Sequence, residues 1–174
     1  MKSVRIIANI LYYLTRVAAI LYLITAAYSL LVVLLNAAGA NAPMEAGNGQ
    51  FRIYYPFTTT TFLLGDDTGS YLTMMILVIS FYGVFLWLLS NVFNTFRQQK
   101  LFTAKSVMRL SRFYVTNLTV PLICLIAALL FYHEAVSDVL MLTFLHIIIG
   151  IFAFFMAAIF RQGLVLQEEQ DLTL

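Results

Sequence analysis

The sequence contains little charge and a single cysteine. Only 10% of its 174 residues are charged, whereas 62% are hydrophobic and the mean hydropathy is +0.92. Soluble domains carry about 25% charged and about 45–50% apolar residues. A soluble fold of this composition could not cover its surface with polar side chains, so apolar surface must face lipid. We therefore expect residues 1–174 to form one integral membrane domain.

The lone cysteine, Cys124, excludes an internal disulfide and any metal site built from several cysteines. It lies in an apolar run, so we expect it to act as a small hydrophobic side chain. His133, Glu134 and Asp138 are three potential metal ligands close together, but their spacing matches no known metal motif. We expect a solvated connector there, with no metal ion, and we expect no cofactor elsewhere.

Long apolar runs are what the sequence has in excess. A bilayer core of about 30 Å requires about 20 apolar residues in a helix. Four stretches reach that length, and they predict an all-α membrane protein with a four-helix transmembrane bundle. The predicted spans are residues 14–35, 71–93, 113–132 and 139–160.

The N-terminal region has a second interpretation. Lys2 and Arg5, then an apolar stretch, then the small residues 37–42 also follow the order of a secretory signal peptide. The apolar part of a signal peptide is about 7–15 residues long, and the stretch after Arg16 is longer. We therefore expect an uncleaved membrane anchor.

The distribution of basic residues predicts the orientation. If the N-terminus, the loop 94–112 and the tail 161–174 share one side, that side holds every basic residue except Arg52. Short loops rich in lysine and arginine stay in the cytoplasm. We expect a multi-pass protein of the cell (inner or plasma) membrane with both termini in the cytoplasm. The basic residues are Lys2, Arg5, Arg16, Arg52, Arg97, Lys100, Lys105, Arg109, Arg112 and Arg161.

The one sizeable extracytoplasmic segment is then residues 36–70. Its first part, through Gly49, is rich in alanine, glycine and asparagine, and we expect it to be flexible. Strand-forming residues at 50–61, followed by the turn-forming residues 65–69, predict one or two short strands ending in a turn. Pro56 predicts a bend or a sheet edge. We expect a small cap on the bundle, with ligand sensing as the alternative.

Three polar residues lie within or beside the predicted spans. Arg16 has Tyr12 and Tyr13 as neighbours, so we expect it to extend to the headgroups as an interfacial anchor. His146 is the residue of the fourth span with catalytic reach, and Asn117 of the third span could hydrogen-bond to it. Polar contacts between membrane helices are usually structural. We expect structural roles for Arg16, Asn117 and His146.

The predicted cytoplasmic segments carry the most distinctive charges. Thr103 can cap a helix that begins at Ala104. Lys105, Arg109 and Arg112 then recur at spacings of four and three and form one basic stripe. The stripe could bind anionic headgroups or an acidic partner. The cytoplasmic acids could pair with the stripe or bind another protein, and they are Glu168, Glu169 and Asp171.

These two cytoplasmic segments resemble a known family. Gln-Gln-Lys-Leu-Phe-Thr at 98–103 and Val-Met-Arg-Leu at 107–110 are similar to the loop motif of the bacterial domain-of-unknown-function 2975 family. Ile-Phe-Arg-Gln-Gly at 159–163 and Leu-Gln-Glu-Glu at 166–169 resemble its C-terminal signature. The four-span layout with a larger first outer segment also agrees. Leu101 differs from the small or turn-forming residue that often stands at this place in the family.

The resemblance implies a membrane protein without an established activity. Family members are often encoded beside a small helix-turn-helix protein of the Xre/Cro type, which implies a membrane partner for a transcription regulator. We therefore expect a membrane-anchored regulatory or interaction subunit and not an enzyme. The alternative is an oligomeric transporter or channel for ions or small solutes. The lipid bilayer is an expected partner, a homo-oligomer is left open, and the small basic patch argues against direct nucleic-acid binding.

Overall fold

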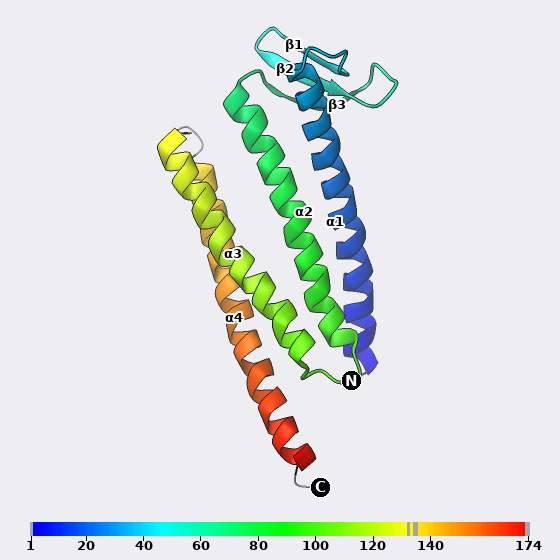
Figure 1. The fold of residues 1–174 in the computed structure, drawn as a ribbon, viewed down its shortest axis with the longest axis vertical. Coiled ribbons are helices and arrows are strands. Elements are labelled where there is room, and N and C mark those ends of the chain that lie inside the picture. The colour runs from blue at the N-terminus through cyan, green and yellow to red at the C-terminus, as the bar shows by residue number, and fades with distance from the viewer. Residues whose placement is uncertain (1, 132, 134–135, 173–174) are drawn as a thin grey trace. The chain divides into compact units, whose positions relative to one another are not determined.

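The computed structural model describes residues 2–131, 133 and 136–172. Within these residues, most of the chain lies in four long α-helices, each long and apolar enough to cross a membrane (Figure 1). In chain order they are α1 (Lys2–Ala37), α2 (Gly69–Arg97), α3 (Ala104–Phe131) and α4 (Val136–Leu172). The four apolar runs of the sequence therefore correspond to four helices.

The helices extend beyond the predicted spans. α1 begins at Lys2 rather than near residue 14, and α4 continues to Leu172 rather than ending near residue 160. A helix rises about 1.5 Å per residue, so α1 and α4 are each about 55 Å long, well beyond a bilayer core of about 30 Å. Residue 132, the predicted end of the third span, lies outside the described residues.

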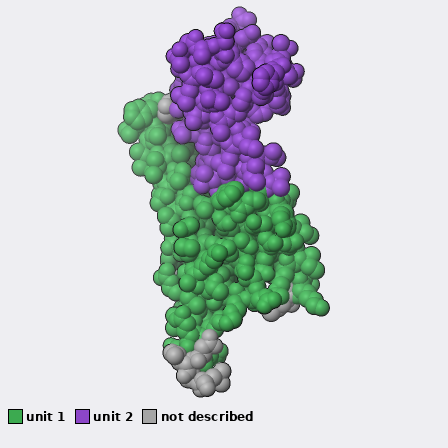
Figure 2. All heavy atoms as spheres, turned by 45° about the vertical axis from the view of Figure 1, so that its right-hand side comes forward, with its two compact units in different colours: residues 1–16, 85–174 green, residues 17–84 purple. Residues whose placement is uncertain are grey.

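The chain forms two compact units (Figure 2). Unit 1 comprises residues 1–16 and 85–174, and unit 2 comprises residues 17–84. Unit 1 thus contains α3, α4, the beginning of α1 and the end of α2. Unit 2 contains the remaining parts of α1 and α2, together with a small sheet.

The sheet in unit 2 is antiparallel, with strand order β1-β2-β3. The strands are β1 (Met44–Gly47), β2 (Gln50–Tyr54) and β3 (Thr61–Asp66). Asn48 and Gly49 connect β1 to β2 with φ angles of 56° and 76°. Positive φ at both central residues is the geometry of a type I′ hairpin turn, which Asn-Gly favours. The expectation of a flexible stretch through Gly49 is therefore wrong, because this dipeptide closes a hairpin.

The end of the sheet also differs from the prediction. Gly65 lies inside β3 instead of in a turn, and α2 begins at Gly69. A Cβ on Gly65 would lie 2.5 Å from the ring of Tyr71 and 2.7 Å from the ring of Phe51. The missing side chain therefore lets both rings pack on the strand. Pro56 follows the end of β2 and lies in a turn, as predicted.

The inner face of the sheet forms the core of unit 2. Phe51 and Ile53 alternate with exposed residues along β2, and both are fully buried against Val32 of α1. The hydroxyl of Tyr28, also on α1, donates to the backbone oxygen of Tyr54 at 2.6 Å. Residues of α2 pack against the same cluster. The strands therefore pack on the last turns of α1 and the first turns of α2.

A side-chain hydrogen bond also links β1 to β2. The Tyr54 hydroxyl donates to Oε2 of Glu45 at 2.6 Å. This hydrogen bond is the main reason that the pKa of Tyr54 is raised above its ordinary value, with smaller contributions from burial and from the charge of Glu45. The small cap expected from the sequence is a three-stranded antiparallel sheet whose first two strands form a hairpin.

In unit 1, α3 and α4 pack against each other along their length. Gly150 of α4 allows the side chain of Leu118 to lie directly on the helix backbone, where a Cβ would be only 2.8 Å away. Towards the other end of the pair, Leu110, Ala157 and Phe160 form a buried cluster. Residues 98–103 connect α2 to α3. The predicted cytoplasmic segment 94–112 therefore includes the end of α2 and the start of α3, which begins at Ala104 as predicted.

Candidate functional site

The start of α3 has the cap that the sequence predicts. The Oγ1 atom of Thr103 accepts a hydrogen bond from the backbone N–H of Ser106 at 3.1 Å and lies 2.9 Å from the Ser106 hydroxyl. The backbone N–H of Val107 donates to the Thr103 carbonyl at 3.1 Å. Ser106 is buried, so this cap lies within the packed part of unit 1. The Thr103 cap therefore defines Ala104 as the first residue of α3.

The tail contacts the loop through Gly163. A Cβ on Gly163 would lie 2.6 to 2.7 Å from three atoms of the Phe102 ring, so the ring packs directly on the backbone of α4. Phe102 also lies edge-on to Phe160 with ring centroids 5.3 Å apart, and Phe160 lies edge-on to Phe96. The loop motif and the C-terminal motif, which carry the family resemblance, therefore contact each other.

The charged residues predicted to bind a partner follow the two contact residues along the chain, on α3 and on α4. Lys105 and Arg112 are exposed, and Arg109 is half-buried. On α4, Glu168 and Glu169 are exposed. None of these five residues forms an ion pair with another residue that the structure describes. Of the two alternatives for the tail acids, pairing with the stripe is therefore not seen among these five residues.

The sixth predicted residue, Asp171, belongs to the last turn of α4, but its side chain lies outside the described part. The tail is not an irregular segment, because α4 continues as a helix for nine residues beyond Gly163. At about 1.5 Å per residue this extension is about 13 Å long. The exposed acids therefore stand on a helix that Phe102 contacts at its base.

A buried polar pair joins α3 to α4, as the sequence predicts. Nδ1 of His146 lies 2.7 Å from Oδ1 of Asn117. The Asn117 amide nitrogen donates to the backbone oxygen of Phe113 at 2.8 Å, so its oxygen is the atom that accepts from the histidine. From this network we assign the proton to Nδ1. The ring of Phe85 lies edge-on to the imidazole of His146, with ring centroids 5.1 Å apart.

One turn before His146, Thr143 makes a second polar contact between the same helices. Its hydroxyl donates to the backbone oxygen of Pro121 at 3.1 Å, and the side chain is 2% exposed. These polar groups thus form two contacts between α3 and α4.

The Arg16 side chain packs against α2 and against Tyr12 of its own helix. Its guanidinium carbon lies 3.7 Å from the centroid of the Trp87 ring and 5.3 Å from that of Tyr12. Nη2 donates to Oδ1 of Asn91 at 2.9 Å, whereas Nε and Nη1 are buried without a hydrogen-bond partner among the described residues. Sequence reasoning missed Trp87 and Asn91, although their spacing of four residues places them on one face of α2.

The three potential metal ligands near the start of α4 do not form a cluster in the described residues. His133 is exposed, Asp138 lies in the first turn of α4, and Glu134 lies outside the described residues. No group of three His, Cys, Asp or Glu residues in the described part of the chain could hold a metal ion.

Comparison with known proteins agrees with the loop and tail motifs. A search of curated proteins and a search of solved structures each return no match to this chain. A family model described as "Protein of unknown function (DUF2975)" matches residues 36–174. The matched region contains the sheet, α2, α3 and α4, and it includes both segments that meet at Phe102 and Gly163. The chain therefore belongs to the DUF2975 family.

Proposed function

We propose that this chain is a four-span protein of the cell (inner or plasma) membrane, with both termini in the cytoplasm, that acts as a regulatory or interaction subunit. Four helices long enough to cross the bilayer support this proposal, because an even number of crossings returns the chain to its starting side. The basic residues of the first turns of α1, the loop 98–103 and the start of α3 then lie on the cytoplasmic side, as expected for short loops.

The observation that carries the proposal is the contact between the loop and the tail. The ring of Phe102 packs on α4 at Gly163, and α4 then continues as a helix with exposed acids. The basic residues Lys105, Arg109 and Arg112 follow Phe102 by three, seven and ten positions. We call these charged residues the loop–tail surface, and it consists of Lys105, Arg109, Arg112, Glu168, Glu169 and Asp171.

A helical tail with a contact at its base suits the binding of a partner. Binding to an already ordered helix avoids part of the entropy loss that ordering a flexible tail would require. The exposed charges of the loop–tail surface are not paired with one another among the described residues, so they are available to a partner with complementary charges. We propose a small helix-turn-helix regulator as this partner, which is what the family resemblance implies.

The contacts at the helix-breaking residues support this function over an oligomeric transporter or channel. Transport sites are typically built from interrupted helices near the middle of the membrane. Pro121 lies within the continuous helix α3, and its backbone oxygen accepts from Thr143. Gly83 lies within the continuous helix α2, where Leu23 packs on its backbone.

Affinity capture of the detergent-solubilised protein from its native cells tests the proposal. The full chain is compared with a chain ending at Gly163 and with two charge-reversal variants, Glu168→Lys/Glu169→Lys and Lys105→Glu/Arg109→Glu. Lys2→Glu is the matched control, because it reverses a charge on the same predicted side but outside the loop–tail surface.

We expect a helix-turn-helix protein to be recovered with the full chain and with the Lys2→Glu variant. We expect it to be lost with the truncated chain and with both charge-reversal variants. Recovery of the same protein at unchanged yield with the charge-reversal variants would show that the loop–tail surface does not hold it. The proposal would then be wrong.

A further inference from the structure

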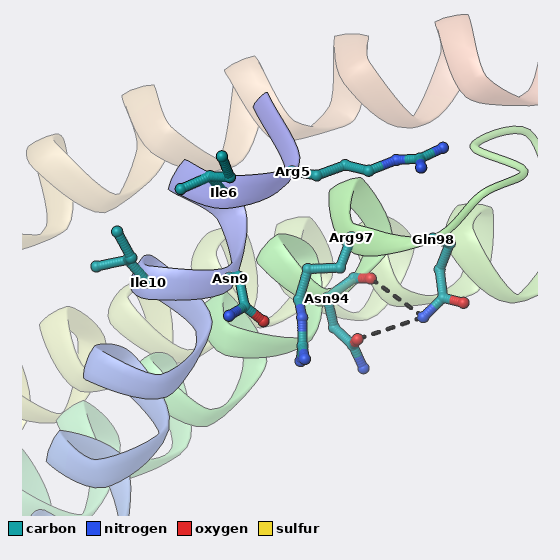
Figure 3. Close-up of a pocket in the computed structure, with 7 residues that line it drawn as sticks. All are labelled: Arg5, Ile6, Asn9, Ile10, Asn94, Arg97 and Gln98. Atoms are coloured by element: carbon teal, nitrogen blue, oxygen red, sulfur yellow. Dashed lines mark hydrogen bonds between the residues drawn. The ribbon is translucent and has the colours of Figure 1, made fainter. Parts of the chain in front are cut away.

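An open groove of about 490 Å³ lies in unit 1 between the first turns of α1 and the end of α2. Its polar lining consists of Arg5 and Asn9 from α1 and of Asn94, Arg97 and Gln98 at the end of α2. In the view of Figure 3 the ends of the Asn9, Asn94 and Arg97 side chains point to one region, whereas the Arg5 side chain extends away from them, above Gln98. None of these residues was singled out from the sequence as a binding site.

The groove is positively charged and has no carboxylate of its own. Residues 1–44 and residues 68–133, which include both helix segments that line it, contain no aspartate or glutamate. Neither Arg5 nor Arg97 forms an ion pair with a residue that the structure describes. Two arginines without a counter-ion, in a concave site, favour the binding of an anion.

Arg97 is held in place by two aromatic rings. Its guanidinium carbon lies 4.2 Å from the ring centroid of Tyr12 and 5.1 Å from that of Tyr13. Stacking on an aromatic face leaves the N–H groups at the edge of the guanidinium able to donate hydrogen bonds. The planar N–H edge of arginine matches the oxygens of a phosphate group.

The amides of the groove can add donors beside this arginine. Nε2 of Gln98 lies 3.4 Å from both the backbone oxygen and the Oδ1 atom of Asn94. Because Oδ1 of Asn94 accepts from Gln98, the amide nitrogen of Asn94 is the atom that remains as a donor. Arginine and amide N–H groups together are the chemistry that recognises a phosphodiester anion.

The remaining side of the groove is apolar, and it is continuous with the apolar surface of α1. Ile6 and Ile10 line the groove. Together with Leu14 they recur every four residues on one face of α1, and they are 61%, 60% and 64% exposed. Inorganic phosphate would gain nothing from this apolar row, whereas the acyl chain of a lipid could lie along it. This row therefore favours a phospholipid over a free phosphate ion.

We propose that this groove binds the phosphodiester headgroup of an anionic phospholipid, with the phosphate between Arg5 and Arg97 and an acyl chain along Ile6, Ile10 and Leu14. The inference rests on the proposed function in one respect, since it requires this end of α1 to lie at the cytoplasmic membrane surface. Basic pockets between membrane helices on that side are known sites for anionic headgroups.

Native mass spectrometry of the purified, delipidated full chain tests the inference. The protein is titrated with phosphatidylglycerol or with phosphatidylcholine of the same acyl chains, and bound lipid is counted. Arg5→Gln is the main variant, because Arg5 is exposed and its loss leaves the stacking of Arg97 intact. Arg97→Gln is the second variant, and Arg161→Gln, at an exposed position of α4, is the control for loss of a positive charge outside the groove and outside the loop–tail surface.

We expect phosphatidylglycerol to bind more tightly than phosphatidylcholine, and Arg5→Gln to weaken its binding about tenfold, the effect of losing one charge-assisted hydrogen bond. The Arg161→Gln variant should bind as the unmodified chain does. Equal binding by the Arg5→Gln, Arg97→Gln and Arg161→Gln variants would overturn the inference. Displacement of the lipid by millimolar inorganic phosphate would also overturn it, because the groove would then be a site for free phosphate.

This assay does not depend on a cytoplasmic protein partner, so the two proposals can fail separately. A chain that binds phosphatidylglycerol through Arg5 but captures no partner would contradict the proposed function alone. A chain that captures its partner through the loop–tail surface but shows no lipid preference would contradict only the lipid site.

Discussion

At the scale of single residues, α4 has two glycines at which another side chain packs directly on the helix backbone. The neighbour is Leu118 at Gly150 and Phe102 at Gly163. In both places an added Cβ would lie less than 3 Å from a side-chain atom. Small residues at such contacts let membrane helices and their connections approach closely. The second of these contacts holds the tail of the proposed binding surface against the loop.

We predict that Gly163→Ala weakens the contact between tail and loop. The Phe102 ring must move to admit the new Cβ, and overpacking of this kind lowers the free energy of unfolding by about 1–3 kcal/mol. The loss should be visible although alanine favours a helix by about 1 kcal/mol over glycine. The measurement is thermal unfolding in detergent, together with hydrogen exchange of residues 98–107.

Gly69→Ala is the control for this substitution, because an added Cβ at Gly69 meets nothing within 4 Å. We expect it to leave exchange at residues 98–107 unchanged. A Gly163→Ala protein as stable and as protected as the control would contradict the close contact of Phe102 with α4.

We also predict that Asn117→Leu destabilises the packing of α3 on α4. His146 would lose the oxygen to which its Nδ1–H donates. Polar pairs between membrane helices contribute about 0.6 kcal/mol on average and up to about 1.7 kcal/mol, so we expect a loss of that order. A double-mutant cycle with His146→Phe, measured by unfolding in mixed micelles, isolates the pair. A coupling energy of zero would show that the hydrogen bond contributes nothing.

At the scale of elements, the four helices and the start of α3 could be predicted from the sequence, but the start of α1 and the end of α4 could not. A count of apolar residues stops where charged and polar residues begin, near residue 14 in α1 and near residue 160 in α4. Backbone hydrogen bonds continue through those residues, because leucine, glutamine and glutamate are also good helix formers. The tail helix, which presents the proposed binding surface, was therefore missed.

The sheet was predicted only in part. Composition alone suggested flexibility for the stretch through Gly49, although Asn48-Gly49 is a strong signal for a hairpin. An Asn-Gly dipeptide predicts a hairpin only where strand-forming residues stand on both sides of it. The segment Met44–Gly47 contains no β-branched or aromatic residue, so it is not recognised as a strand. Pairing with β2, whose inward residues are buried, stabilises this weak strand.

Two parts of the site could be predicted from the sequence, because one depends on neighbouring residues and the other on polar residue types that are rare in apolar spans. The Thr103 cap depends on residues three apart, and Asn117 with His146 are polar residues in otherwise apolar spans. Two other contacts join segments that are far apart in the sequence, and they are Phe102 with Gly163 and Arg16 with Asn91. Arg16 and Asn91 are separated by 75 positions. Nothing in a single sequence specifies which helix faces meet at such distances.

At this scale we predict that Gly49→Val opens the hairpin whereas Gly47→Val does not. Gly49 has a φ of +76°, a conformation that disfavours a side chain by about 1–2 kcal/mol. Gly47 lies in β1, and an added Cβ there meets nothing within 4 Å. Limited proteolysis of residues 36–70 in the purified protein is the measurement. Equal cleavage rates for the two variants would contradict the type I′ turn.

At the scale of the whole molecule, the proposed binding surface and the proposed lipid site require the same orientation. The loop–tail surface, Arg5 and Arg97 must all lie on the cytoplasmic side of the membrane. The sheet must lie on the opposite side, since it is connected between α1 and α2. The short basic segments favour this arrangement, because short loops rich in lysine and arginine generally stay on the cytoplasmic side of a membrane.

Cysteine labelling in intact spheroplasts tests this central claim most directly. Cys124 is first replaced by alanine, and a single cysteine is then introduced by Gly47→Cys, Lys105→Cys or Glu169→Cys, all at exposed positions. A membrane-impermeant maleimide should label the Gly47→Cys protein in intact spheroplasts. It should label the other two proteins only after the membrane is permeabilised. Labelling of the Lys105→Cys or Glu169→Cys protein in intact spheroplasts would contradict the orientation and the cytoplasmic binding surface with it.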